Sequence, residues 1–414
     1  MRRSLNLVRL SRVDSECNVR SESTKGSNMI ITDTIKYAGV ADTDLDLFES
    51  QYIVPEGMLY NSYVILDEKI AIMDTCDKRK VDEWLKNVEE ILAGKNPDYL
   101  VIHHLEPDHS AGILKLHEKY PGMKLVVNPL SARMLPQFVK EDLSSLLVTV
   151  QDKGELSLGT HKLTFFTAPM VHWPEVMVSY ESTEQVMFAA DAFGKFGAQT
   201  DTDDWACEAR RYYFNIVGKY GDNVQMLLGK IKDLPIKTIC PLHGPVLSDD
   251  LGYYVDLYNT WSSYECENKG IFIACASIHG NTMDAALYLK EQLESMAGED
   301  TKIAFTDLTR EDWAEAVEDA FRYDRMILLS SSYNTGLFPP MENFLHHLAA
   351  DNYQKRRVAL VENGSWAPSA GRVMKSILEP LKDVTIRDKV ITIKTTMTPE
   401  NEAELKELAK EFLD

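Results

Sequence analysis

One short segment restricts most strongly what this chain can fold into: the hexapeptide His104-Leu-Glu-Pro-Asp-His109 carries four side chains with metal-ligand chemistry. Three further side chains of the same kind, His172, Asp191 and His243, stand far along the chain. A random cluster of four ligand types in six residues is rare, so we interpret the hexapeptide as part of a metal site. Four imidazoles and three carboxylates exceed what a single zinc ion needs and indicate two metals.

Length and charge limit the classes of protein to consider. A chain of 414 residues is too long for one ordinary domain, so we expect two. Its 44% hydrophobic and 26% charged residues are typical of a soluble globular protein. The formal charge of −20 argues against a nucleic-acid surface, which needs a basic footprint. No apolar run is long enough to predict a membrane span.

The six cysteines are widely spaced, and no two of them form a C-x-x-C pair. This spacing excludes a rubredoxin-like or zinc-ribbon module. So few cysteines in so large a chain also make a disulfide framework a poor interpretation, and we expect a cytoplasmic protein.

The first 28 residues differ in composition from the rest, with five Arg and six Ser and no apolar segment of a secretory signal. An Arg- and Ser-rich start resembles an organellar transit peptide, although Asp14, Glu16 and Glu22 weaken that interpretation. We expect residues 1–28 to be a disordered extension ahead of a native start at Met29.

Strand patterns dominate residues 29–265. Residues 60–66 and 69–73 are rich in Val, Ile and Tyr and predict a hairpin, and residues 80–92 have the apolar spacing of a helix. Further strands are predicted at residues 99–102, 162–167, 176–180, 185–189 and 237–240. Every candidate ligand follows one of these strands, as expected of a site where strand ends converge. We predict a mixed sheet sandwich with flanking helices.

Strands and helices alternate strictly from residue 270 to the C-terminus. Strands are predicted at residues 271–274, 303–305, 326–329, 358–361 and 390–393. Helices are predicted between them, with a last helix from about residue 399. Five strands alternating with helices predict a doubly wound parallel sheet, which binds ligands where its strands end.

The spacing of the metal motif divides its ligands. His104 and Glu106 can face one way in an extended loop, while Asp108 and His109 turn towards a second metal. Asp191 is the only distant acid and therefore the best candidate for a bridge. The ligand set suits iron or manganese as well as catalytic zinc. We expect His103 to point away from the site.

Three loops of small and polar residues follow strands of the second domain. They are residues 277–282, 330–336 and 363–367. The first precedes a helix, where hydroxyls and backbone N–H groups suit a phosphate, and Gly280 permits a close turn. An ordinary helix cap at Asn281 or Thr282 would give a similar pattern. Trp366 offers a face on which a flat ring could stack, although a loop Trp is more often a packing residue.

The chain resembles the flavodiiron proteins. Its first domain is similar to the metallo-β-lactamase fold and its second to flavodoxin. Lactamase-type hydrolases carry His-x-His-x-Asp-His, whereas Glu106 gives this chain the His-x-Glu-x-Asp-His of the diiron branch. The segments Tyr60-Asn-Ser-Tyr63, His172-Trp-Pro174, Asp191-Ala-Phe-Gly194 and His243-Gly-Pro245 also resemble that family. The resemblance covers residues 29–414 and implies an αββα sandwich followed by a flavodoxin-like five-stranded parallel sheet.

The resemblance also implies roles for individual residues. One iron would be held by His104, Glu106 and His172, the other by Asp108, His109 and His243, with Asp191 as the bridge. FMN would bind the three loops of the second domain. The implied contacts are Ser277, His279, Gly280, Asn281, Thr282, Ser332, Tyr333, Asn334, Thr335, Asn363, Gly364, Ser365 and Trp366. The chain departs from the family at Glu49, which follows Phe48 where many members have His.

The implied activity is transfer of electrons through FMN to a diiron centre, with reduction of O2 to water or of NO to N2O. A rubredoxin-type protein is the expected donor, and a head-to-tail homodimer or a dimer of dimers is the expected assembly. Two other functions are weighed against it. One is a two-metal hydrolase with an accessory flavodoxin-like domain, and the other is a flavin electron carrier whose first domain is structural. Glu106 and the flavin loops argue against the hydrolase, and the seven ligand residues against the carrier.

Overall fold

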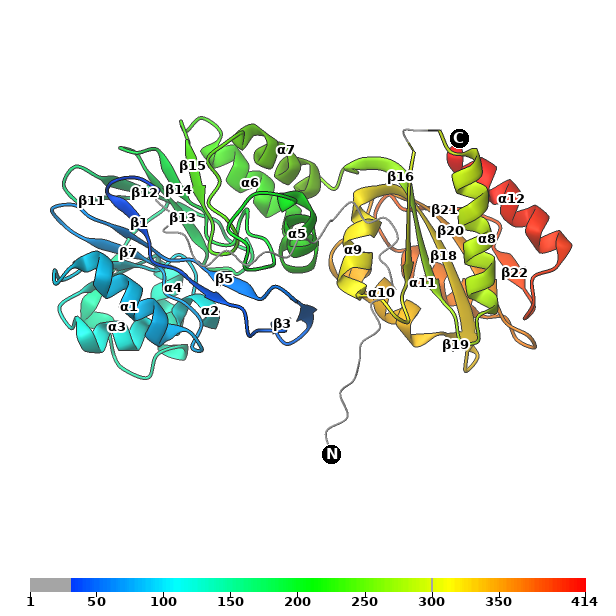
Figure 1. The fold of residues 1–414 in the computed structure, drawn as a ribbon, viewed down its shortest axis with the longest axis horizontal. Helices are drawn as coiled ribbons and strands as arrows, with labels where there is room; N and C mark the ends of the chain where they lie inside the picture. Colours follow the sequence, from blue (N-terminus) through cyan, green and yellow to red (C-terminus); the bar gives the residue numbers. More distant parts are fainter. Residues whose placement is uncertain (1–30, 299–300) are drawn as a thin grey trace.

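The computed structural model describes residues 31–298 and 301–414, so the extension predicted at residues 1–28 lies outside the described residues. Figure 1 shows two bodies joined by a short connection between α7 (Leu251–Ser262) and β16 (Asn268–Ala276). The first body has two sheets with helices outside them, and the second has one sheet with helices on both faces. Within the described residues, no helix is long and apolar enough to cross a bilayer.

Two facing sheets form the first body. The six-stranded sheet has the order β1 (Ile35–Tyr37), β6 (Tyr63–Ile65), β7 (Ala71–Met73), β8 (Tyr99–Val101), β9 (Lys124–Val127) and β10 (Leu147–Thr149). The five-stranded sheet has the order β11 (Glu155–Ser157), β12 (Lys162–Thr167), β13 (Met177–Glu181), β14 (Val186–Phe188) and β15 (Thr238–Cys240). Two small pairs accompany them: β2 (Val40–Asp42) with β5 (Met58–Tyr60), and β3 (Leu47–Phe48) with β4 (Tyr52–Ile53).

Helices cover the outer faces of both sheets, which completes an αββα sandwich (Figure 1). They are α1 (Val81–Leu92), α2 (Pro107–Ser110), α3 (Ile113–Lys119), α4 (Pro129–Met134), α5 (Trp205–Tyr212), α6 (Gly221–Ile231) and α7. Short turns of helix lie at Leu135–Gln137, Ser144–Leu146 and Gly218–Tyr220, and a π-helix lies at Tyr213–Val217. The amphipathic pattern of α1 explains its docking, because Val81, Trp84, Val88 and Leu92 recur at helical spacing and are all buried.

One strand prediction was wrong in detail. Residues 60–66 do not form a continuous strand, because the chain leaves β5 at Tyr60 and enters β6 at Tyr63 in a different sheet. The two residues between them turn their polar side chains inward. The Asn61 amide donates to the carbonyls of Pro241 and Gly244, and the Ser62 hydroxyl donates to the Asp74 carbonyl. These bonds replace the ladder that a longer strand would have made.

A parallel sheet forms the second body, as predicted. Its order is β17 (Lys302–Asp307), β16, β18 (Tyr323–Tyr333), β20 (Arg357–Asn363) and β21 (Thr385–Ile386), and β22 (Ile391–Ile393) also pairs with β20. The short β19 (Gly336–Leu337) pairs with the end of β18. The helices are α8 (Asn281–Met296), α9 (Trp313–Arg322), α10 (Pro339–Ala350), α11 (Ala370–Leu378) and α12 (Pro399–Leu413).

Alternation along β16 explains why this sheet is covered on both faces. Ile271 and Ile273 pack in the cluster that contains α8 and α12, whereas Phe272 and Ala274 pack in the cluster that contains α9 and α10. Side chains of a strand point to opposite faces in turn, so an apolar run of this kind requires helices on both sides.

The two bodies are joined by buried charges and stacked rings. Arg210 on α5 pairs with Glu267 and with Glu318 of α9, and its side chain is almost completely buried. The rings of Phe214 and Phe321 stack with centroids 4.3 Å apart. These contacts involve α9 and Glu267, which directly precedes β16.

Candidate metal centre

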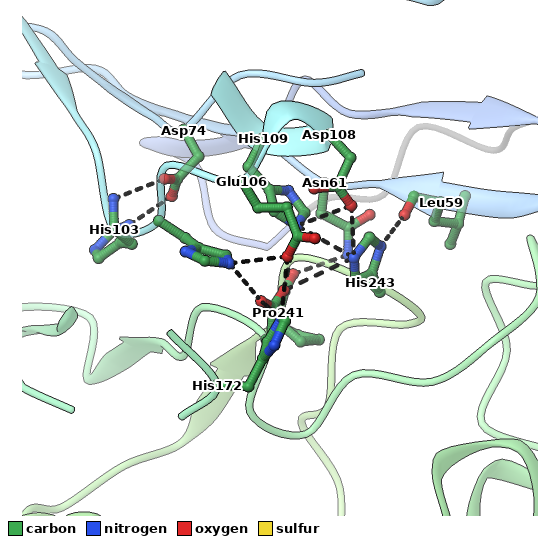
Figure 2. A network of polar contacts seen from close by, with 12 residues as sticks. Leu59, Asn61, Asp74, His103, Glu106, Asp108, His109, His172, Pro241 and His243 are labelled. Atoms are coloured by element: carbon green, nitrogen blue, oxygen red, sulfur yellow. Dashed lines mark hydrogen bonds and ion pairs between the residues drawn. The ribbon is translucent and has the colours of Figure 1, made fainter. Parts of the chain in front are cut away.

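The structure brings the seven predicted ligand side chains together at one end of the first sandwich. His104 follows β8, His172 follows β12, Asp191 follows β14 and His243 follows β15. Asp108 and His109 are carried by α2, because the chain turns into a helix at Pro107. Proline suits the first turn of a helix, where its missing N–H is not needed. Figure 2 shows the side chains of Glu106, Asp108, His109, His172 and His243 converging.

Four of the ligands form a first group around Glu106. The Nε2 atoms of His104 and His172 each lie 3.1 Å from Glu106 Oε2. The same two nitrogen atoms lie 3.4 Å and 3.3 Å from Asp191 Oδ2. Two imidazoles and two carboxylates therefore surround one point.

Asp108, His109 and His243 form a second group. The Nε2 atoms of His109 and His243 are 3.1 Å apart, and they lie 3.4 Å and 3.3 Å from Asp108 Oδ2. They lie 3.2 Å and 3.7 Å from Asp191 Oδ1, the carboxylate oxygen that the first group does not contact. Asp191 thus presents one oxygen to each group, which is the geometry of a bridging ligand.

The donor atoms fit two cations. His104 Nδ1 donates to Glu175 and His243 Nδ1 donates to the Leu59 carbonyl, which leaves each Nε2 free to bind a metal. Both carboxylate oxygens of Asp108 and of Asp191 are buried without a hydrogen bond. Nitrogen and oxygen ligands about 2.0–2.2 Å from one metal lie about 3.0–3.5 Å from each other, close to the separations seen here.

Mutual electrostatics supports the same interpretation. Burial disfavours the charged form of His172, but its contacts with Asp191 and Glu106 outweigh burial and raise its pKa to about 9. Burial acts against ionisation of Asp191 too, yet the surrounding imidazoles hold its pKa well below the usual range. In the ion-free protein, a proton on His172 therefore supplies part of the positive charge that a metal would bring.

Three loops of the second body meet at the carboxyl ends of adjacent strands. Residues 277–282 follow β16, residues 330–336 follow the core of β18, and residues 363–367 follow β20. The first two loops touch, since the hydroxyls of Thr282 and Ser331 are 2.9 Å apart. The chain order of the sheet reverses between β16 and β18, where doubly wound sheets bind their ligands.

These loops differ in what they leave available to a ligand. The Asn363 amide is occupied by the backbone of Thr395, and the Ser332 hydroxyl accepts from the N–H groups of Ser369 and Ala370. The Ser332 O–H and one N–H of the Asn363 amide remain available to donate to a ligand. Trp366, by contrast, is 81% exposed, so it is not the packing residue that a loop Trp usually is.

Comparison with known proteins matches both bodies of the structure. Residues 58–244 match the family model described as ODP family beta lactamase. A nitric oxide reductase of Moorella thermoacetica is 27% identical over 364 residues, covering 85% of this chain and 90% of that protein.

Solved structures share the whole fold. Rubredoxin oxygen:oxidoreductase from Desulfovibrio gigas has a TM-score of 0.85 at 23% identity, covering 94% of this chain and 98% of that one. A flavodiiron protein from Giardia intestinalis has a TM-score of 0.85 at 21% identity, covering 95% and 98%. The fold is therefore that of the flavodiiron proteins, with a metallo-β-lactamase-like body followed by a flavodoxin-like one.

The turn between β3 and β4 lies beside the metal ligands. The ring of Phe48 contacts that of His243, with centroids 5.3 Å apart, and Glu49 follows it in the turn. Desolvation and the negative charge of Glu106 raise the pKa of Glu49. The departure from the family pattern thus places a carboxyl group that readily holds a proton near the metal ligands.

Sequence reasoning missed the residues that orient the metal ligands. Glu175 is buried, and its Oε1 accepts from His104 Nδ1 at 2.8 Å and from the Leu105 N–H at 3.0 Å. Its place three residues after His172 was the available signal. No sequence signal pointed to the Leu59 carbonyl, which orients His243. The contact uses the backbone of a residue 184 positions away, so it does not depend on the type of side chain.

We expect Glu175→Gln to weaken metal binding by about 10-fold and Glu175→Ala by about 100-fold, as for other partners of metal-bound histidines. The amide keeps both hydrogen bonds but loses the negative charge that makes His104 a better ligand. Metal retention during dialysis against a chelator would measure the effect. Glu181→Gln is the matched control, because Glu181 is also buried on β13 but holds the backbone of Thr183 and Glu184. Equal metal loss in both variants would contradict the orienting role of Glu175.

Proposed function

We propose that this protein is a flavodiiron oxidoreductase that takes electrons through FMN to a diiron centre and reduces O2 to water, NO to N2O, or both. The observation that carries the proposal is the placement of Asp191, with one carboxylate oxygen towards each of two ligand groups. The same chain carries three loops suited to a flavin. A two-metal hydrolase would have no use for those loops.

Each ligand residue has a place in this proposal. His104, Glu106 and His172 would hold one iron, and Asp108, His109 and His243 the other, with Asp191 shared between them. When bound, FMN would accept electrons from a donor and the iron pair would deliver them to the small oxidant. Glu49 lies in the turn after Phe48, whose ring contacts His243, and desolvation and the charge of Glu106 raise the pKa of its carboxyl group.

The second body supplies the proposed FMN site. Gly280, at a φ of 96°, caps the N-terminus of α8, where backbone N–H groups favour a phosphate. Trp366 and Tyr333 are exposed aromatic side chains on the other two loops, and either would offer a face to the flavin ring. Ser277 and Thr282 supply hydroxyl groups beside Gly280.

We also propose a rubredoxin-type donor and a head-to-tail dimer in which the flavin loops of one copy face the metal ligands of another. Among the described residues, the flavin loops make no hydrogen bond or ion pair with the first body of the same chain, and the junction uses α9. Two apolar surfaces support the pairing. Leu47 and Ile53, opposite each other on β3 and β4, are 39% and 48% exposed, and the flavin loops expose Ile278, Tyr333 and Trp366.

We expect Ile53→Glu to dissociate the dimer and abolish electron transfer while each copy keeps its cofactors, because a charge would be buried in an apolar contact. Analytical ultracentrifugation would give the mass, and flavin absorbance and iron content would show that the sites survive. Met226→Glu is the control, since Met226 is 56% exposed on α6, away from this hairpin. A dimeric Ile53→Glu protein with parent turnover would rule out this interface.

Parallel electrode measurements of O2 and NO consumption test the activity, with one preparation reduced through a rubredoxin-type donor. Faster loss of NO would indicate a nitric oxide reductase, and faster loss of O2 without released peroxide an oxygen reductase. Consumption of neither would contradict the proposal.

A further inference from the structure

Three buried polar side chains, Asp74, His103 and Ser179, form a hydrogen-bonded chain inside the first sandwich. Asp74 Oδ2 lies 2.5 Å from His103 Nδ1, and His103 Nε2 lies 2.8 Å from Ser179 Oγ. The side chains are at most 1% exposed. With its proton on Nδ1, the His103 ring donates to Asp74 and accepts from the Ser179 hydroxyl, so both ring nitrogens are satisfied.

The hydrogen-bonded side chains of Asp74, His103 and Ser179 connect the two sheets through an apolar layer. Asp74 follows β7 and His103 follows β8 in one sheet, while Ser179 lies on β13 of the other. Apolar residues of both sheets, such as Met73, Val101 and Phe188, surround them. Polar groups in such a layer are favourable only when fully paired, and a paired network fixes a single arrangement of its members.

The order Ser, His and Asp resembles that of a hydrolytic triad, but these residues cannot act as one. A nucleophilic serine must reach its substrate, and Ser179 is completely buried. Figure 2 shows His103 directed towards Asp74 and away from the metal ligands, as the sequence predicted. Any effect of Asp74, His103 and Ser179 on the metal site must therefore pass through the backbone of His103.

The backbone of His103 is held on both sides, directly before the ligand His104. Its N–H donates to Asp74 Oδ1 at 2.7 Å, and its carbonyl accepts from the Met177 N–H at 3.1 Å. Asp74 thus binds both the ring and the backbone of His103. His104 directly follows this fixed residue. Its side chain therefore has little freedom to move towards a metal.

We propose that Asp74, His103 and Ser179 are positioning residues that fix His104 and thereby set the affinity and geometry of the metal held by His104, Glu106 and His172. The inference rests on the two-metal site proposed above. It predicts a selective effect, because the second metal is supported elsewhere. Thr75 donates to the His109 carbonyl from its N–H and from its hydroxyl, at 3.0 Å and 2.7 Å.

The test compares Ser179→Ala with Thr75→Val in the full-length protein, freed of metal and reloaded anaerobically with ⁵⁷Fe²⁺. Equilibrium titration gives the affinity of each of two sites, and Mössbauer spectra distinguish the two irons. For Ser179→Ala we expect about 10-fold weaker binding of one iron and a changed signal for that iron only. For Thr75→Val we expect the other iron to change. Ser179→Thr, which keeps the hydroxyl, should restore the affinity that Ser179→Ala loses.

Several outcomes would overturn the inference. If Ser179→Ala lowered the melting temperature but left the iron affinities and Mössbauer spectra unchanged, Asp74, His103 and Ser179 would form a purely structural contact between the sheets. Selective positioning would also be excluded if one variant bound both irons equally more weakly. The same conclusion would follow if both variants lost affinity for the same iron. If the parent protein took up no iron pair, the proposed function would fail and the inference with it, whereas a normal pair in the parent and in Ser179→Ala defeats the inference alone.

Discussion

Replacing Asp191 by Ala is expected to reduce turnover of O2 or NO by more than about 100-fold, since even residues that only orient metal ligands contribute about 10–100-fold. Asp191 contacts both ligand groups, with Oδ2 towards His104 and His172 and Oδ1 towards His109 and His243. Without it, neither group keeps its shared carboxylate. Steady-state consumption with a reducing donor measures the loss.

FMN binding should survive Asp191→Ala, because the flavin loops belong to the other body. Flavin absorbance of the purified variant checks this. Asp152→Ala is a suitable control, since Asp152 is a carboxylate held by Lys230 and Thr167 away from the metal ligands. Parent turnover in Asp191→Ala would mean that the ligand assignment is wrong.

Replacing Gly280 by Val is expected to weaken FMN binding by about 10–100-fold, because a left-handed backbone conformation costs a non-glycine residue about 1–3 kcal/mol. Gly280 has a φ of 96° and a ψ of −29° at the N-terminus of α8. A Cβ there would meet no protein atom within 4 Å, so the penalty comes from the backbone and from crowding of a bound phosphate. Fluorescence titration of the flavin-free protein with FMN gives the affinity.

Gly229→Ala is the control for Gly280→Val. Gly229 lies inside α6, its φ is not positive, and an added Cβ there would also meet nothing within 4 Å. Alanine favours a helix over glycine, so the control should be neutral or slightly stabilised and should bind FMN normally. Normal FMN affinity in Gly280→Val would show that this loop does not bind the phosphate.

Periodic patterns made much of the fold predictable. Alternating strands and helices after residue 270 predicted the parallel sheet, because each strand must be apolar on both faces when helices cover it. The apolar spacing of residues 80–92 predicted the helix α1 equally clearly. The small pairs β2–β5 and β3–β4 were not predictable, since strands of two or three residues carry no period.

The candidate site was predictable only where side-chain type reveals chemistry. Four ligand-type side chains lie close together in the sequence, which made them recognisable as metal ligands: His104, Glu106, Asp108 and His109. The contacts that hold His103 and His243 involve the Ser179 hydroxyl and the Leu59 carbonyl, whose residue types are ordinary and whose partners are far away in the chain. Only the folded chain shows that Ser179, on a strand of the other sheet, supports the residue beside His104.

Metal and flavin analysis of the purified protein tests the central claim most directly. Elemental analysis and identification of the released flavin should give two iron ions and one FMN per chain. Zinc in place of iron, with no flavin, would contradict the account and indicate a two-metal hydrolase. Flavin without metal would contradict it as well and would leave an electron carrier.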